Sequence, residues 1–246
     1  MSFRFFIQAL LIILIATSCS HYYYTQSVHN VPLFKEKNEF HGTVALGVGV
    51  EEISTTEIQT AYAISDKFAV MANFLYGSGA SSTNLDNGSG SYFEAAFGYY
   101  KPITNSSIFE VYGGIGTSQQ HHQYSTSGST ADLGFNKIFI QPSIGLSFKV
   151  FDFALTSRFA ALSFYKVDNM ISFDFDSYEY NALEDISQNS TSLLWEPGIT
   201  VRMGWKQVKL QMQVLGSKNL SHEDLNFEGL SINAGLYITL AKRYSK

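Results

Sequence analysis

Apolar and polar residues alternate along residues 136–161 with the period of two that a β-strand requires. The apolar parity of the first arm consists of Ile138, Ile140, Pro142, Ile144, Leu146 and Phe148. The other parity is polar or small, and it consists of Gln141, Ser143, Gly145, Ser147 and Lys149. After a break at Phe151 and Asp152, the second arm repeats the pattern. Two amphipathic strands joined by a tight turn form a β-hairpin.

The same alternation recurs from Phe40 onward and predicts ten strands. They cover approximately residues 40–50, 55–64, 68–77, 91–100, 107–118, 136–149, 153–164, 192–204, 208–217 and 229–241. Most of these segments are near the ~9–11 residues that a tilted strand needs to cross a bilayer. We therefore interpret residues 40–246 as one domain built from strands.

The connections between these strands alternate in length, after a tight first one at Glu51 and Glu52. The long connections are residues 78–90, 119–135, 165–191 and 218–228. Outer-membrane barrels have short periplasmic turns and longer extracellular loops. The pattern predicts an all-β fold: an antiparallel up-and-down transmembrane β-barrel in the cell outer membrane, with both termini in the periplasm. A soluble lipocalin-like barrel is the alternative fold.

The barrel interpretation predicts which side chains face lipid and which face the lumen. Ile140, Leu146, Ile199 and Leu236 should face lipid, whereas Glu94 and Arg158 should face the lumen. Strict alternation also explains a mean hydropathy of −0.01, because each lipid-facing residue is averaged against a polar one.

Composition narrows the class of protein further. The net charge is −5, charged residues make up 15% and aromatic residues 15% of the chain. These values argue against a disordered chain and against a nucleic-acid partner, which would call for a basic stripe.

The first 18 residues have the features of a signal peptide. Arg4 precedes a short apolar run that ends in the small residues Ala16, Thr17 and Ser18. The run is too short to span a bilayer comfortably, so we expect an exported protein. Cys19 is the only cysteine, and its position resembles the bacterial lipoprotein signal, in which the cysteine is lipidated. An ordinary signal peptide with a chance cysteine is the alternative. Residues 19–39 follow neither period and are interpreted as a lipidated N-terminal linker.

Residues 30–37, with the sequence NVPLFKEK, resemble the opening of Bacteroidetes-type outer-membrane lipoprotein β-barrels. Similar features follow at residues 61–64, 109–114 and 139–142. The resemblance implies a fold and a location, with no biochemical activity attached. Asn233, Gly235, Ile238 and Leu240 also resemble the C-terminal signal that barrel-assembly machinery recognises, although the chain ends in Lys-Arg-Tyr-Ser-Lys rather than an aromatic residue.

Charged side chains on the inward parity predict a polar network in the lumen. They are Glu57, Glu94, Glu110, Lys149, Arg158, Glu196, Arg202 and Lys209. Unpaired buried charges are costly, so we expect salt bridges and glutamine contacts among them. We hypothesise that Arg158 is the centre of a middle layer with Glu57, Glu94 and Glu196. A barrel of this size should hold mainly side chains rather than a wide pore.

Other residue clusters carry weak chemical signals. His121 and His122 match no known metal-ligand spacing. Residues 221–223, Ser-His-Glu, contain the residue types of a catalytic triad, but adjacent residues do not generally adopt that geometry. The connection 165–191 is acidic, which would suit weak binding of divalent cations but is typical of a solvated loop. We therefore predict no catalytic residues, no metal site and no cofactor.

These observations favour a non-enzymatic outer-membrane lipoprotein with a structural or surface-interaction role. Its expected partners are outer-membrane lipids, the barrel-assembly machinery during biogenesis and an unidentified extracellular ligand of the loops. The alternatives are a narrow channel for ions or small solutes and a lipid-modifying outer-membrane enzyme.

Overall fold

The computed structural model describes residues 22–49, 53–80, 86–125, 128–170, 178–222, 225 and 227–244. The strands are β1 (Phe40–Gly49), β2 (Ile53–Ala63), β3 (Phe68–Ala80), β4 (Asn87–Pro102), β5 (Ser107–Tyr124), β6 (Ser129–Ser147), β7 (Phe151–Met170), β8 (Thr191–Gly204), β9 (Val208–Gly216), β10 (Lys218–Asn219) and β11 (Leu230–Leu240). Ten of them are nine residues or longer, and β10 has two residues. The predicted signal peptide and Cys19 lie outside the described residues.

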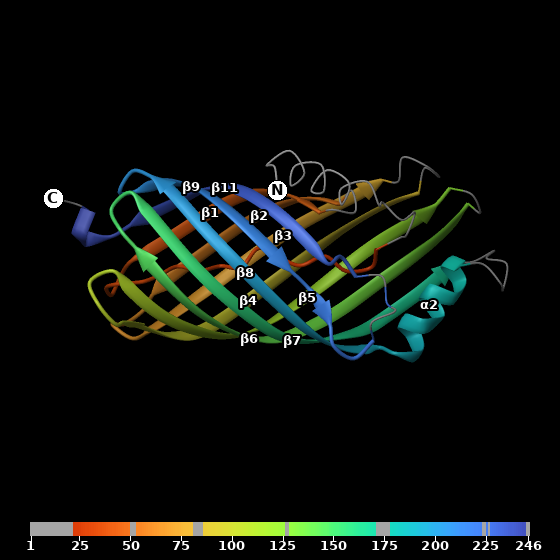
Figure 1. The fold of residues 1–246 in the computed structure, drawn as a ribbon. Helices are drawn as coiled ribbons and strands as arrows, with labels where there is room; N and C mark the ends of the chain where they lie inside the picture. The colour runs from red at the N-terminus through yellow and green to blue at the C-terminus, as the bar shows by residue number, and fades with distance from the viewer. Residues whose placement is uncertain are drawn as a thin grey trace, which may run out of the picture.

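All strands belong to one closed antiparallel sheet (Figure 1). Long strands that are consecutive in the chain pair with each other, and β1 pairs with β11 over Phe40–Gly49 and Ser231–Leu240. This last pairing joins the first and last strands of the barrel. The predicted up-and-down barrel of ten long strands is confirmed.

Apolar side chains cover the outside of the barrel. Ile140 is 52% exposed, and Leu146, Ile199 and Leu236 are likewise exposed, whereas Arg158 is 0% exposed. The sheet thus has its apolar face outward, as the sequence predicts, and a soluble barrel with an apolar core is ruled out. A closed sheet with this exterior satisfies its backbone hydrogen bonds without edges, as a membrane-spanning sheet must. The chain is an outer-membrane β-barrel.

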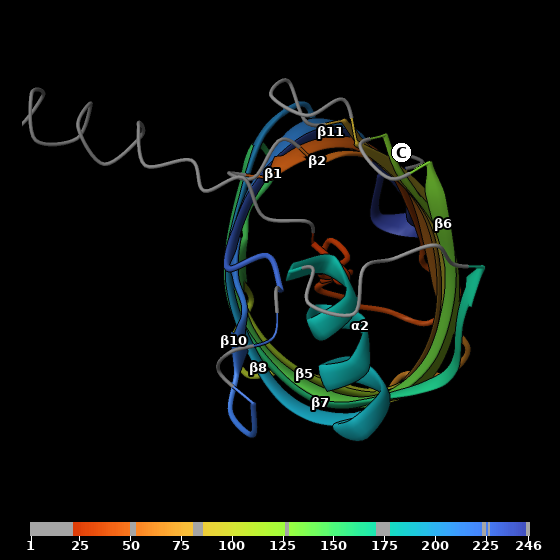
Figure 2. The same cartoon turned by 90° about the vertical axis from the view of Figure 1, so that its right-hand side faces the viewer.

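The two ends of the barrel differ. One end, which we call the turn end, carries the short connections at 64–67, 103–106, 148–150 and 205–207, together with the 3-10 helix η1 (Lys242–Tyr244) near the C-terminus. The other end, the loop end, carries the helix α2 (Tyr178–Gln188), which lies across the mouth of the barrel (Figure 2). Leu183 and Ile186 are one helical turn apart on α2 and are both buried. The sequence analysis predicts a loop at this position, because the segment is dominated by polar residues.

Within the described residues, no helix has the length and apolar character needed to cross a bilayer.

Five strands, β3 to β7, extend at the loop end by three or more residues into segments interpreted as loops. The four longest, β4 to β7, have 16 to 20 residues. The pairing of Ser118–Tyr124 with Ser129–Phe135 shows this extension. The outward parity of the β6 extension carries Thr130 and Asp132, because a strand outside the bilayer needs no apolar outer face. Its inward parity carries Ala131, Leu133 and Phe135, which are buried in the lumen. The outward-facing apolar signal is therefore lost there although the strand continues.

Replacing an isoleucine with arginine should have different effects in the bilayer-embedded wall and in the water-exposed turns. Ile140→Arg should lower the free energy of unfolding by ~2–4 kcal/mol if the residue lies near the midplane of the bilayer. Ile103→Arg, at an isoleucine of similar exposure (56%) in a short connection, should change it little. Urea unfolding of both variants in lipid vesicles measures the difference. Equal losses would contradict the assignment of the outer face.

Candidate functional site

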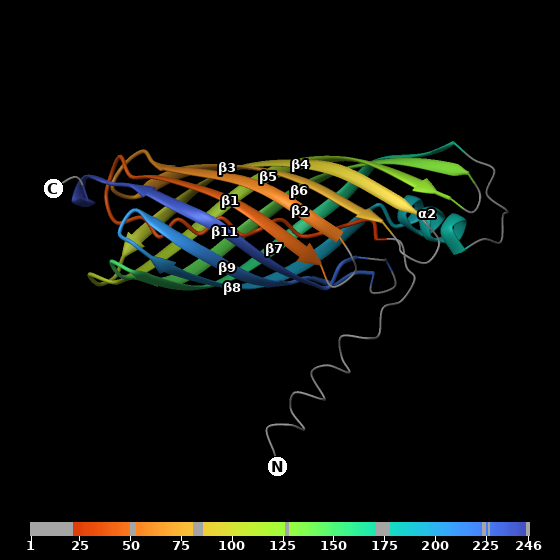
Figure 3. The same ribbon diagram turned by 90° about the horizontal axis from the view of Figure 1, so that it is seen from above.

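Residues 22–39 run through the inside of the barrel, and we call them the thread. Figures 1 and 3 show this segment in red among the strands from the side, and Figure 2 shows it inside the ring of strands. Tyr23, Val31 and Phe34 are no more than 1% exposed. The interpretation of residues 19–39 as a linker is therefore wrong for the described part, residues 22–39. These residues fill the lumen and form part of the core of the barrel.

Charged contacts hold the thread at the turn end. The Lys35 Nζ donates hydrogen bonds to the backbone oxygens of Asn105 (3.1 Å) and Ser147 (2.6 Å) in the adjoining short connection and strand end. Glu39 accepts a hydrogen bond from the backbone N–H of Lys35 (3.0 Å) and pairs with the guanidinium of Arg243. The end of the thread is thus fastened to one short connection, to the end of β6 and to the C-terminal segment.

Amide and carboxylate side chains hold the middle of the thread in the manner of a neighbouring strand. The backbone N–H of Val28 donates to Glu57 (2.8 Å), and the Val28 oxygen accepts from Gln59 (2.7 Å). Gln213 does the same for His29: it accepts from the backbone N–H (2.6 Å) and donates to the backbone oxygen (3.0 Å). A buried backbone without regular structure needs such partners, and the lumen side chains supply them.

Two further lumen charges bind thread backbone rather than an opposite charge. Arg202 donates to the oxygen of Val31 (2.8 Å) and to Gln211 (2.7 Å). Glu110 accepts from the backbone N–H of Phe34 (2.9 Å). The lumen around Arg202 and Glu110 is therefore organised by contacts with the thread and not only by pairing between the strands.

Arg158 connects a carboxylate of the wall to the thread. Its guanidinium donates to Glu94 (3.1 Å), to the side-chain oxygen of Gln141 (2.7 Å) and to the hydroxyl of Ser27 (2.9 Å). Gln141 in turn donates to the backbone oxygen of Asn30 (2.8 Å). The described hydrogen bonds thus link Arg158 directly to one carboxylate of the predicted middle layer and, through Ser27 and Gln141, to the thread.

A second buried ion pair lies closer to the loop end. The Lys137 Nζ is 2.8 Å from Glu196 and donates to the hydroxyl of Tyr24 (2.6 Å), which also donates to Glu196. All three side chains are no more than 2% exposed. Glu196 is therefore satisfied by a lysine of β6 and a tyrosine of the thread.

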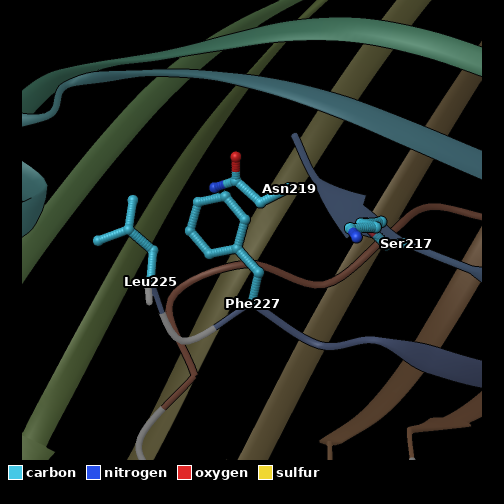
Figure 4. A pocket seen from close by; sticks show the side chains of 5 residues that line it. Ser217, Asn219, Leu225 and Phe227 are labelled. Atoms are coloured by element: carbon cyan, nitrogen blue, oxygen red, sulfur yellow. The ribbon is translucent and has the colours of Figure 1, made fainter. Parts of the chain in front are cut away.

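The loop end closes over the thread with apolar and aromatic side chains. Tyr24 forms a β-bridge with Phe227, and Leu183 and Ile186 of α2 belong to the same buried cluster as Tyr23 and Tyr24. Beside this cluster lies a hollow of about 260 Å³. Its lining, shown in Figure 4, consists of Ser217, Lys218, Asn219, Leu225 and Phe227.

Two wall glycines make room for the thread. A Cβ at Gly145 would lie 2.6 Å from Leu33, and a Cβ at Gly198 would lie 2.8 Å from the ring of His29. Both glycines occupy the lumen-facing parity of their strands. Leu33 itself has a φ of 58°, in the left-handed region that non-glycine residues rarely adopt. The wall and the thread are therefore shaped for each other.

The predicted lumen charges are buried, with one exception. Those inside are Glu57, Glu94, Glu110, Arg158, Glu196, Arg202 and Lys209. Lys149 is exposed, and its assignment to the lumen is wrong. The hairpin turn lies at residues 148–150 and not at Phe151 and Asp152, since the Phe148 N–H donates to the Phe151 oxygen (2.8 Å). Asp152 consequently enters the lumen and pairs with Lys209 (2.7 Å).

Sequence reasoning missed Lys137 and the thread. Lys137 shares the inward parity of Gln141, and extending the alternation by two pairs of residues would have found it. The thread has no periodic signal, because its backbone is satisfied by side chains and not by a ladder. A periplasmic N-terminus was also expected, whereas Tyr23 at the start of the described thread lies beside Tyr124 near the loop end, with hydroxyls 3.0 Å apart.

The clusters with weak chemical signals separate in the structure. His121 is exposed and 2.7 Å from Asp132, whereas His122 points inward with its ring centroid 5.3 Å from that of Tyr23. Glu223 lies outside the described residues. The part of the acidic connection that the structure describes includes Asp168, which pairs with Lys166 (3.3 Å). Among the described residues, no group of three or more His, Cys, Asp or Glu could hold a metal ion.

No family model matches the chain, and no curated protein matches it in sequence. Among solved structures, it is similar to the translocator domain of the autotransporter NalP from Neisseria meningitidis, with 10% identity, coverage of 83% of this chain and 86% of that chain, and a TM-score of 0.44. LpxR from Salmonella typhimurium has 5% identity, coverage of 80% and 99%, and a TM-score of 0.41. The outer membrane protease OmpT from Escherichia coli has 11% identity, coverage of 88% and 99%, and a TM-score of 0.43.

These likenesses concern the fold, which is that of outer-membrane β-barrel proteins of Gram-negative bacteria. They also correct one expectation. The sequence analysis predicts that the chain is not an enzyme, and this is wrong as an inference from the barrel, because a protease is among the proteins with this fold. The fold alone gives no ground for denying the chain a catalytic activity.

Removing the Arg158 side chain should expose the dependence of the lumen on paired charges. Arg158→Met leaves Glu94 buried without its cation, which should cost ~3–5 kcal/mol of unfolding free energy. The double variant Arg158→Met, Glu94→Gln should recover part of that loss. Lys166→Met, which breaks exposed contacts, should cost at most about 1 kcal/mol. Denaturant unfolding in detergent measures all three, and equal losses for Arg158→Met and Lys166→Met would refute the role of Arg158.

Glu39, just before β1, should make the stability of the turn end depend on pH. Burial alone would raise its pKa, but hydrogen bonds and charges from His41 and Arg243 outweigh burial and lower the pKa from 4.5 to about 2. The ionised carboxylate therefore stabilises the folded state fully above pH 4.5, and this contribution is lost as the pH falls toward 2. The destabilisation caused by Glu39→Gln should shrink over that interval. Denaturant unfolding at a series of pH values measures this. A difference in unfolding free energy between the natural chain and Glu39→Gln that stays constant over that interval would contradict this assignment.

Proposed function

We propose that the chain is an outer-membrane lipoprotein of the Bacteroidetes barrel type with a structural or surface-interaction role. Its lumen is closed by its own thread, and its loop end is the surface that contacts an extracellular ligand. Cys19 carries the lipid anchor, outer-membrane lipids surround the wall, and barrel-assembly machinery inserts the protein.

The observation that supports this proposal is the way the thread is held. Its backbone is hydrogen-bonded by side chains from separate sides of the lumen, among them Glu57 of β2, Glu110 of β5, Arg202 of β8 and Gln213 of β9. A segment tied to several strands leaves little room for a continuous water path. This argues against the narrow channel among the alternatives.

The loop end supports the surface-interaction role. α2 and the hollow lined by Asn219, Leu225 and Phe227 offer both apolar and polar groups at the exposed end. A ligand that presents an apolar part to Leu225 and Phe227 fits this composition.

The position of Cys19 in the sequence supports the lipoprotein assignment. Cys19 follows a short apolar run and small residues. Acyl chains on it would add ~0.8 kcal/mol of membrane affinity per buried CH₂ to a barrel that is already embedded. The anchor would therefore fix the position of the N-terminal segment more than it would hold the protein in the membrane.

Conductance in planar bilayers tests the closed lumen. The natural chain should insert without discrete current steps, because the thread occupies the lumen. A variant that lacks residues 22–34 should show steps, provided that its heat-modified gel mobility confirms a folded barrel. Steady steps from the natural chain would overturn the proposal, and this result does not depend on the variant.

A further inference from the structure

The thread has a defined direction through the barrel. Its last residue, Glu39, precedes Phe40, which pairs with Tyr62 and Leu240 beside a short turn and the C-terminal segment. At the opposite end, the backbone N–H of Glu228 donates to the oxygen of Tyr24 (2.9 Å). Followed from Glu39 back toward the N-terminus, the chain therefore enters the lumen at the turn end and reaches the loop end at Tyr22.

Both ends of the thread are held by hydrogen bonds, so its direction through the barrel depends on several contacts. Near the loop end, the Thr25 hydroxyl donates to Glu228 (2.5 Å) and the Gln26 amide donates to Ser231 (3.2 Å). Withdrawal of the thread toward the turn end would leave Glu57, Glu110 and Arg202 buried without their backbone partners. Each unsatisfied buried group would destabilise the withdrawn state, and a buried charge would do so most.

The two ends of an outer-membrane barrel face different compartments. Short turns lie on the periplasmic side and long loops lie outside the cell. The thread thus runs from the periplasmic side to the extracellular side, and Tyr22 is at the extracellular end.

The position of Tyr22 limits where Cys19 can be. Three residues of extended chain span at most ~11 Å, whereas the hydrocarbon core of a bilayer is ~30 Å thick. An acyl group on Cys19 could therefore reach the outer leaflet near the loop end but not the inner leaflet on the periplasmic side.

We propose that the barrel delivers its own N-terminal segment through its lumen to the cell surface, so that acyl chains on Cys19 insert into the outer leaflet. The surface location depends only on the thread, whereas the acyl part rests on the proposed lipoprotein function. Tyr22, the first described residue of the thread, then lies on the extracellular side, at the end of the barrel that carries α2.

An epitope inserted between Ser20 and His21 tests the surface location. Antibody applied to intact cells should bind this tag as strongly as the same tag inserted between Asn189 and Ser190 at the loop end. The same tag between Asp66 and Lys67, in a short turn, should bind antibody only after the outer membrane is opened. Heat-modified gel mobility selects the variants that form the barrel.

The result that overturns the proposal is an N-terminal tag that denaturing blots detect but that intact cells hide, as they hide the turn tag. Incorporation of a fatty-acid probe, abolished by Cys19→Ser, tests lipidation separately. A surface-exposed tag without probe incorporation keeps the surface location and refutes the anchor. Probe incorporation with a hidden tag keeps the lipoprotein and refutes the passage through the lumen.

Discussion

Hydrogen bonding between lumen side chains and the backbone of the thread is the interaction on which the rest of this barrel depends. The inner face of the wall carries carboxylates, amides and arginines at positions that are almost fully buried, such as Glu57, Gln213 and Arg202. Buried polar groups are tolerated only when they have partners. The thread supplies those partners as N–H and C=O groups, and the wall in turn satisfies a backbone that has no ladder of its own. Neither part has a satisfactory buried state without the other.

The outside of the barrel follows a simpler rule and was accordingly easy to predict. Hydrocarbon requires apolar side chains at every second residue, so the alternation around Ile140 and Ile199 identified both the strands and their outward face. Most predicted strand ends are within a few residues of the observed ones, for example 208–217 against Val208–Gly216. The apolar outer face ends where the constraint ends, in the extensions of β5 and β6 above the bilayer.

The inside could be predicted only in part. The alternation identified the buried charges of the wall, because the residue next to a lipid-facing residue in a strand faces the lumen. It did not identify their partners: Glu110 and Arg202 bind the backbone of the thread, and any sequence presents the same backbone groups. Lys149 was misplaced because a shift of a hairpin turn by a few residues moves side chains between the lumen and solvent. The glycines that accommodate the thread, Gly145 and Gly198, read as ordinary strand residues until the segment they face is known.

The seam between β1 and β11 has a consequence for biogenesis. The thread continues directly into β1, and β1 can complete its pairing with β11 only when the whole chain has been made. If an acylated N-terminus has to end on the far side of the membrane, it must pass while the cylinder is still open, since a polar interior filled with hydrogen bonds offers no route for fatty acyl chains afterwards. Closure of this seam would then be the irreversible step of assembly, and the order of events would be set by chain connectivity and not by the strength of any one contact.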